Sequence, residues 1–240
     1  MDKRQELYRG KAKTMYATDD PMRLVMHYRD DVSAFDGVKL AKLEQKGETN
    51  NRINAFIMGK LAVAGVRSHF ISLLNERESL VKAMKMIPVE CVVRNICAGS
   101  MAKRYGLEEG LRLPEPIFEF FLKSDALHDP LVNDDHIRVL EWATASEITQ
   151  MKALTHRVNA VLKPLFSSAG IDLVDYKLEF GHPLDDPHGE IVLGDEFTPD
   201  GCRLWDARTG EKLDKDRFRR DLGEVIEHYR DVARRIGVAL

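Results

Sequence analysis

The sequence predicts an α+β fold, with a strand-rich N-terminal part and a larger part that combines strands with long helices. In residues 7–28, two runs rich in apolar residues flank an Asp-Asp-Pro turn, which is typical of an antiparallel meander. Thr144 and Glu147 form a capping-box pattern ahead of a long segment with helical spacing. Pro88 interrupts a further strand pattern, and we expect a boundary there. The expected lobes are residues 1–87 and 88–240.

Composition limits the classes of protein that the sequence can represent. The 240 residues carry a net charge of −3, with 44% hydrophobic and 31% charged residues, as in an ordinary globular protein. This charge provides no general attraction to nucleic acid or to an anionic membrane. No apolar run reaches transmembrane length, and the N-terminus lacks a signal core. Three cysteines without metal-binding spacing fit a reducing cytoplasm: Cys91, Cys97 and Cys202.

A glycine and two lysines follow the first expected strand. Gly10 permits a ligand to approach the backbone closely, and Lys11 and Lys13 share one face of an extended chain. Together with Ala12 they suit a polyphosphate, although the segment lacks both the P-loop and the Rossmann pattern. A solvated basic turn is the alternative explanation for the same residues.

Residues 30–86 are expected to contain an acidic loop, a helix and two strands. Residues 30–37, which include Asp36, have the composition of a surface loop. The helix is expected to run from about residue 46 to 65, with an apolar face formed by Ile53, Phe56, Ile57 and Leu61. Strands are expected over 70–74 and 80–86, and the second carries Lys82 and Lys85.

The segment after Pro88 combines a strand with a candidate anion site. In the strand expected over 89–95, Glu90 and Arg94 lie on one face. A short helix is expected to start near Ser100, where unpaired backbone N–H groups attract anions. Arg94 and Ser100 therefore predict a pocket for a monophosphate. An ordinary helix start, capped by the serine and flanked by surface bases, is the alternative.

The C-terminal part begins with one more strand and ends in helices. Residues 113–116 are expected to be a stiff proline-containing connector, followed by an apolar strand over 117–123. The capped helix is expected to bend or end near Pro164, because proline removes a helical hydrogen bond. One amphipathic helix is expected over 214–236.

Residues 174–206 are expected to form two strands joined by a polar loop. Side chains alternate between the faces of a strand, so Lys177 and Glu179 share a face, and a hairpin would bring Glu179 close to Asp195. Two neighbouring carboxylates repel each other unless a cation lies between them. Mg²⁺ prefers such oxygen ligands and commonly bridges phosphates. A solvated strand face with paired charges is the alternative.

Several motifs together resemble those of the SAICAR synthetase family, in the family's order and spacing and over nearly the whole chain. They are GKAK at 10–13, SAFDG at 33–37, IPVECVVRNICAGS at 87–100, PEPIFEFFLKSDALHDP at 114–130, YKLEFG at 176–181 and GDEFTPDGCRLWD at 194–206. The length resembles the bacterial single-function form. Two departures are Thr198 in place of serine and a longer loop at 182–189, which we expect to leave the pocket untouched.

The resemblance implies a fold and a reaction. Family members have a small antiparallel N-terminal lobe and a larger α/β lobe, with ATP in the cleft between them. They ligate L-aspartate to the carboxylate of 5-amino-4-carboxyimidazole ribonucleotide (CAIR) in purine biosynthesis. The reaction is expected to pass through an acyl phosphate and to form SAICAR, ADP and phosphate. The resemblance also implies Mg²⁺, a cytoplasmic location and a homodimer.

The resemblance assigns roles to individual residues. The nucleotide is expected to contact Gly10, Lys11, Ala12, Lys13, Lys82, Met86 and Lys123. Mg²⁺ is expected on Glu179 and Asp195, and CAIR on Arg94, Ser100, Lys177 and Arg203. The residues expected nearest the reacting groups are Lys13, Lys123, Asp36 and Asp129.

Two rival functions would use the same features. A nucleotide-dependent kinase would phosphorylate another small acceptor and would need no amine. A nucleotide- or RNA-binding module would leave ATP unchanged, although the mild net charge and the few aromatic residues near basic ones argue against RNA.

Overall fold

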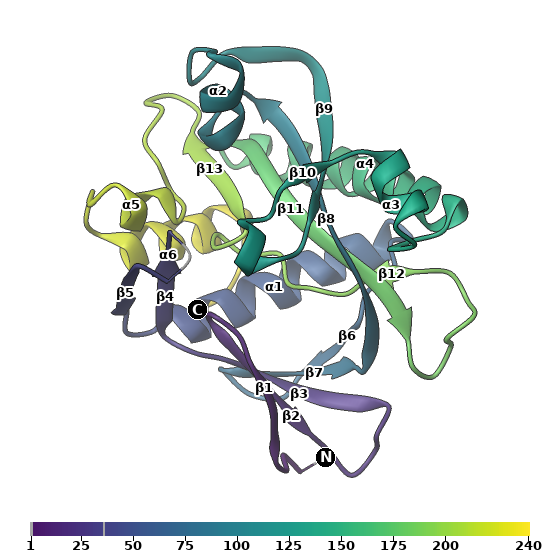
Figure 1. The fold of residues 1–240 in the computed structure, drawn as a ribbon. Helices are drawn as coiled ribbons and strands as arrows, with labels where there is room; N and C mark the ends of the chain where they lie inside the picture. Colours follow the sequence, from purple (N-terminus) through teal and green to yellow (C-terminus); the bar gives the residue numbers. More distant parts are fainter. Residues whose placement is uncertain (1, 36) are drawn as a thin grey trace.

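The computed structural model describes residues 2–35 and 37–240, and most of its strands belong to two antiparallel sheets (Figure 1). The first sheet has the order β1-β2-β3-β7-β6 and comprises β1 (Glu6–Arg9), β2 (Lys13–Ala17), β3 (Arg23–Tyr28), β6 (Phe70–Leu73) and β7 (Glu78–Lys82). Strands β1 to β3 confirm the meander predicted for residues 7–28. A separate hairpin, β4 (Asp31–Ala34) and β5 (Lys39–Lys42), replaces the loop expected over 30–37.

The second sheet has the order β10-β9-β8-β11-β12, and β13 also pairs with β11. Its strands are β8 (Met84–Ile96), β9 (Arg112–Leu122), β10 (Leu131–Val132), β11 (Ile171–Pro183), β12 (Val192–Leu193) and β13 (Cys202–Asp206). The hairpin expected over 174–206 is confirmed by the pairing of β11 with β12. Its first strand is also paired with β8 and is almost entirely buried, so it lies in the interior of the sheet.

Helix α1 lies between the two sheets, and α4 covers one face of the second sheet (Figure 1). The helices are α1 (Lys46–Val63), α2 (Gly99–Tyr105), α3 (Asp134–Val139), α4 (Ala145–Ser168), α5 (Asp216–Arg219) and α6 (Val225–Ile236), with a 3₁₀ turn, η1 (Asp125–Leu127). The capping box is confirmed, since Glu147 N donates to Thr144 Oγ1 at 3.2 Å and Thr144 N donates to Glu147 Oε2 at 2.6 Å. Helix α4 continues four residues past Pro164, so of the two expectations, a bend or an end at this proline, the end is wrong.

Prolines that were expected to interrupt strands lie instead inside long ones. Strand β8 runs through Pro88, where its register with β11 shifts between the partners Glu179 and Gly181. A proline lacks an N–H donor, and a register irregularity is a place where that donor is not needed. Residues 113–116 belong to β9 rather than to a connector, and they lie opposite another register shift.

The single helix expected over 214–236 is wrong. Asp221, Gly223 and Glu224 have φ values of 55°, 73° and 51°, so the backbone leaves the right-handed helical conformation between α5 and α6. This turn separates Phe218 from Tyr229 along the chain, yet both pack in one cluster with Val32 of β4.

The expected division into 1–87 and 88–240 follows the sheets more closely than the core. The first sheet ends at Lys82 and the second begins at Met84. The main hydrophobic cluster crosses this point, because Ile57 of α1 packs in the same cluster as Val89 of β8 and Leu162 of α4. Independent folding of the two parts is therefore not expected.

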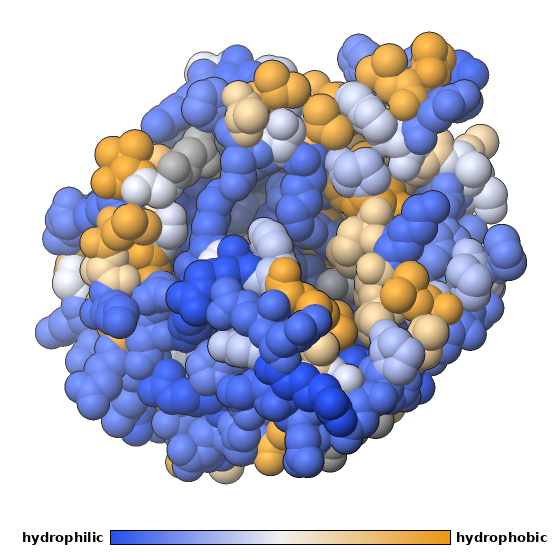
Figure 2. Space-filling model, turned by 60° about the horizontal axis from the view of Figure 1, so that its bottom comes forward, coloured by the Kyte–Doolittle hydropathy of each residue, from blue (hydrophilic) through white to orange (hydrophobic). Residues whose placement is uncertain are grey.

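One face of the molecule is hollowed, and mainly hydrophilic residues line the hollow (Figure 2). Within residues 2–35 and 37–240, no helix is both long and apolar enough to cross a membrane.

Candidate active site

The centre of the site is a network of charges on β11 and on the chain just beyond β12. Gly194 N donates to Glu179 O at 2.9 Å, which sets the next residue, Asp195, beside the strand that carries Glu179. Lys177 Nζ lies 2.5 Å from both Glu179 Oε1 and Glu90 Oε1. The side chains on one face of β11 are thus joined to the neighbouring strand β8.

Two lysines from distant segments complete this network. Lys13 of β2 forms ion pairs with Asp195 and Glu196, and Lys123, just after β9, pairs with Glu179. Glu179 is 2% exposed, so its charge depends on these partners. The network therefore connects the first sheet to the second.

The ionisation of the network follows from these contacts. Burial raises the pKa of Asp195, but Lys13 and Lys177 outweigh burial and hold it below its ordinary value. Burial lowers the pKa of Lys177, but Glu179 and Glu90 raise it overall. Burial is the largest effect on Glu90 and leaves its pKa raised despite Lys177.

The composition of the network favours a bound cation. The three lysines Lys13, Lys123 and Lys177 face four carboxylates, Glu90, Glu179, Asp195 and Glu196, which leaves one excess negative charge if all ionise. Among the described residues, no group of three or more His, Cys, Asp or Glu side chains has the arrangement of a complete metal site. The carboxylates thus fit a metal that completes its shell with water or phosphate, as Mg²⁺ does.

The turn at residues 10–13 is shaped by Arg29, a residue that the sequence patterns missed. Its guanidinium donates to Lys13 O at 2.6 Å, to Gly10 O at 2.7 Å and to Thr14 Oγ1 at 2.6 Å. These bonds gather the turn's carbonyl oxygens on one side. Lys11 is half exposed and pairs with Asp125 of η1 at 2.9 Å. An arginine directly after an expected strand gave no local signal for this contact.

Close backbone packing explains two glycines beside the network. A Cβ at Gly181 would lie 2.5 Å from Lys85 O, and a Cβ at Gly194 would lie 2.8 Å from the Met86 side chain. Met86 therefore covers the turn that leads into Asp195, and it remains 36% exposed. Larger residues at either glycine would displace β8 or Met86.

A second group, which we call the arginine row, crosses the other half of the sheet. Asp175 Oδ2 of β11 accepts from Arg94 Nη1 of β8 and from Arg203 Nη1 of β13, both at 2.8 Å. Arg94 also donates to Glu119 of β9 at 2.9 Å, and Arg203 donates to Asp216 of α5 at 2.9 Å. Burial lowers the pKa of Arg203, but the two aspartates raise it overall.

The arginine row lies against the start of α2. Arg94 Nη2 donates to Ser100 Oγ at 3.2 Å, so the two residues expected to share a pocket are in contact. A Cβ at Gly99 would lie 2.4 Å from Arg203 Nη2, so only glycine leaves room for this guanidinium, and its φ of 56° also favours glycine. Ala98 rather than Ser100 precedes the helix, so the serine cap of the alternative explanation is not formed.

The other residues expected at the site have different surroundings. Asp129 Oδ1 accepts from Ser124 N at 2.8 Å and thus stabilises the loop after β9. Lys82 lies 3.4 Å from Asp185 of the long loop, so this loop does contact a residue expected to bind nucleotide. Asp36 lies outside the described residues.

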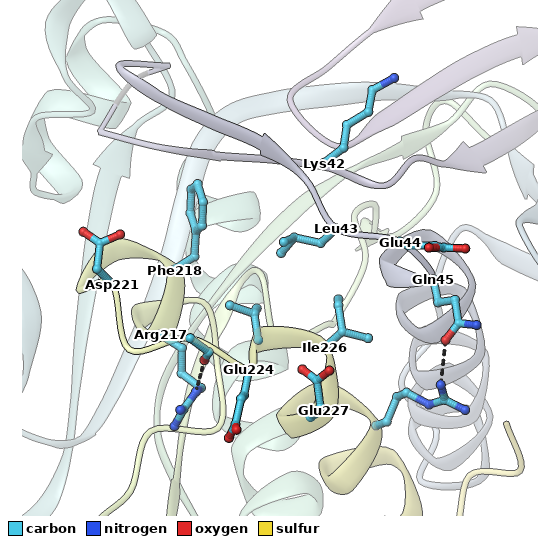
Figure 3. Close-up of a pocket in the computed structure, with 13 residues that line it drawn as sticks. Lys42, Leu43, Glu44, Gln45, Arg217, Phe218, Asp221, Glu224, Ile226 and Glu227 are labelled. Atoms are coloured by element: carbon cyan, nitrogen blue, oxygen red, sulfur yellow. Dashed lines mark hydrogen bonds between the residues drawn. The ribbon is translucent and has the colours of Figure 1, made fainter.

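Two cavities are lined by residues other than the members of the two charged groups. One, of about 720 Å³, lies beside β5 and helices α5 and α6 (Figure 3). The other, of about 430 Å³, is lined by residues that include Arg9, Asp30 and Arg77. Neither is lined by a residue that the sequence analysis assigned to a ligand.

Comparison with known proteins identifies close relatives. A sequence model described as SAICAR synthetase matches residues 6–236. Phosphoribosylaminoimidazole-succinocarboxamide synthases from Hahella chejuensis and Idiomarina loihiensis are 62% and 63% identical, over 238 residues (99% of each chain) and 240 residues (100% of each chain). The crystal structure of the synthase from Ehrlichia chaffeensis has a TM-score of 0.96 and 44% identity, covering 98% of this chain and 100% of that one. A SAICAR synthetase in complex with ADP has a TM-score of 0.92 and 44% identity, covering 97% of each chain.

Proposed function

Because this chain belongs to the SAICAR synthetase family, we propose that its two charged groups divide the substrates of the family reaction between them. The enzyme uses ATP to ligate L-aspartate to CAIR and forms SAICAR, ADP and phosphate. The observation that carries the assignment is that residues from five separate segments meet in one network around Glu179 and Asp195: Lys13, Glu90, Lys123, Lys177 and Glu196.

The chemistry explains why charge must gather here. A carboxylate is a poor acyl electrophile, because attack on it would have to expel oxide. Transfer of the ATP γ-phosphoryl group to CAIR makes that oxygen part of an acyl phosphate, and the amine of aspartate then displaces phosphate. Such a transfer depends on positioning and on neutralising the phosphate oxygens rather than on a covalent protein group.

The nucleotide occupies the side of the network formed by the first sheet. Gly10, Lys11, Ala12 and Lys13 form the turn held by Arg29, and Lys13 points to the network. Lys11 and Lys13 bind the ATP phosphates, Lys123 approaches them from β9, and Met86 and Lys82 lie by the base. A neighbouring family structure described as a complex with ADP supports a nucleotide site on this fold.

Glu179 and Asp195 would hold Mg²⁺, which supplies charge neutralisation at the phosphate oxygens. Burial raises the pKa of Asp195, but Lys13 and Lys177 outweigh burial and hold that pKa below its ordinary value. Phosphate oxygens would take over the contacts that the lysines now make with the carboxylates. The residues present therefore fit the metal only together with the nucleotide.

CAIR binds along the arginine row. Its ribose phosphate meets Arg94, Arg203 and Ser100, and Lys177 lies between this phosphate and the network, where the CAIR carboxylate reacts. Guanidinium groups suit such anions because they offer paired N–H donors. Asp36 and Asp129 are assigned to the reacting end, and the present contact of Asp129 with Ser124 gives it a loop-stabilising role as well.

We further propose that the chain forms homodimers in the cytoplasm and that residues 1–87 and 88–240 form the two lobes. Analytical ultracentrifugation tests the oligomeric state. Expression of each lobe alone tests whether the lobes depend on each other. Because one hydrophobic core contains residues of both, we expect that neither lobe folds alone.

The function is tested by measuring ADP release while each of CAIR, L-aspartate, ATP and Mg²⁺ is omitted in turn. Release that requires all four supports the proposal. Release without aspartate, with a stable phosphorylated product, would favour the kinase alternative. ATP that remains unchanged in the complete mixture would favour a binding protein.

A further inference from the structure

Lys215, at the start of α5, is a cation whose side chain has no partner within residues 2–35 and 37–240. It is partly buried, yet its ammonium group forms no hydrogen bond or ion pair with another described residue. Long cationic side chains are seldom buried unless they are paired. Its backbone is fixed, since Lys215 N donates to Pro199 O at 3.2 Å and Lys215 O accepts from Arg219 N at 3.1 Å.

Asp200, the carboxylate whose charge acts most strongly on Lys215, already has other partners. It pairs with the fully buried Lys46, accepts from Asn50 Nδ2 at 2.9 Å and accepts from Tyr229 OH at 2.8 Å. Burial raises the pKa of Asp200, but the charges of Lys46 and Lys215 lower it overall, and Lys215 forms no bond with this carboxylate. The Asp200 carboxylate is therefore bonded to side chains of α1 and α6.

Arg219, one turn along α5, extends the arginine row. Its Nη1 lies 2.5 Å from Asp216 Oδ1, and Asp216 also accepts from Arg203. Residues four apart lie on the same side of a helix, so Lys215 and Arg219 face the same region. Lys215 and Arg219 do not line the cavity in Figure 3. Arg217 and Phe218, on the same helix, do line it.

The charges around Lys215 are mostly of its own sign. Burial is the largest cause that lowers its pKa, to about 8, and Arg219, Lys46 and Lys11 lower it further, against the opposing charge of Asp200. Lys11 belongs to the turn assigned to ATP, whereas Arg219 adjoins the row assigned to CAIR. Charged residues of both assigned groups therefore act on Lys215, and among these described residues its own charge is the one that has no partner.

We propose that Lys215 and Arg219 bind a carboxylate of the L-aspartate substrate. Of the three substrates, aspartate is the one to which no residue is assigned. It is a dicarboxylate, so it carries the negative charge that would pair with Lys215. Bound there, its amine would lie between the nucleotide and CAIR, where the acyl group is formed. This proposal rests on the proposed positions of ATP and CAIR.

The test compares the wild type with Lys215→Gln, Lys215→Arg and Arg220→Gln. Arg220 is the matched control, because it directly follows the same helix and pairs with Glu109 at 2.6 Å, with only a longer contact of 3.7 Å to Asp216. Steady-state kinetics varies each substrate in turn. Succinate, a dicarboxylate without an amine, serves as a competitive inhibitor toward aspartate and reports binding separately from turnover.

Lys215→Gln is expected to raise the KM for aspartate and the inhibition constant of succinate by about tenfold to a hundredfold, since a charge-assisted bond is lost. The KM values for CAIR and ATP stay near wild type, Lys215→Arg restores most of the affinity, and Arg220→Gln behaves as wild type. Unchanged inhibition by succinate would overturn the proposal, as would a rise in the KM for CAIR in place of that for aspartate. Wild-type ADP release that needs no aspartate would instead refute the proposed function.

Discussion

Replacement of Arg203 by lysine tests the arginine row most directly. Arg203 reaches two carboxylates through different nitrogens, Asp175 through Nη1 at 2.8 Å and Asp216 through Nε at 2.9 Å. A lysine carries all of its donors on one atom and cannot reproduce this planar arrangement. One charge-assisted bond to a buried carboxylate is therefore lost, which costs about 1.5–3 kcal/mol of stability. For a chain of this size, the unfolding temperature should fall by roughly 3–12 °C.

The effect on catalysis follows from the same geometry. If Arg203 also holds the CAIR phosphate, the KM for CAIR rises about tenfold to a hundredfold, because a comparable bond to the ligand is lost. The KM for ATP changes little, since no nucleotide contact is assigned to the arginine row. Steady-state kinetics and thermal unfolding measure the two effects separately.

Arg112→Lys is the matched control. Arg112 pairs with Asp172 at 2.6 Å, but its side chain is 68% exposed, and exposed ion pairs contribute little. The control should leave both KM values and the unfolding temperature near wild type. If Arg203→Lys lowers the unfolding temperature but leaves the KM for CAIR within about twofold, the residue is structural only and the pocket is misplaced.

Three further perturbations test the network and the core. Glu179→Gln or Asp195→Asn should abolish turnover without unfolding the protein, because each removes a ligand charge but little volume; full activity of both variants at low Mg²⁺ would contradict the metal assignment. Lys13→Ala should raise the KM for ATP more than that for CAIR, by about tenfold for one charge-assisted contact, and equal changes would count against it. Burial lowers the pKa of His69 to about 4. Because the unfolded state binds the proton more tightly, stability should be lost as pH falls from about 6.5 to 4, by up to about 1.4 kcal/mol per pH unit. Denaturant titrations at several pH values measure the free energy of unfolding. In His69→Asn this free energy should fall less steeply with pH over this range than in the wild type, and an identical dependence on pH would refute the reasoning.

Local patterns in the sequence predicted the elements whose signals are local. The meander, the capped start of α4 and the length of α1 each depend on residues within a few positions of one another. Glu179 and Asp195 were also within reach of such reasoning, because one hairpin connects their strands. The family resemblance added roles to residues that spacing alone left ambiguous, such as Lys11 and Ser100.

Tertiary structure decided what depends on strands that are distant in sequence. Pro88 was expected to end a strand. The register shift that lets β8 contain a residue without an N–H donor depends on the pairing with β11, which the residues around Pro88 do not reveal. Arg29 carried no signal, since its bonds to residues 10–13 exist only once β3 pairs with β2. Lys215 was missed for the same reason. Its lack of a partner in the described part of the chain follows from Lys46, Asn50 and Tyr229, which bond to Asp200 only when α1 and α6 pack together. A sequence specifies the charge of each side chain, whereas the partners left to satisfy that charge are set by the packing of the whole chain.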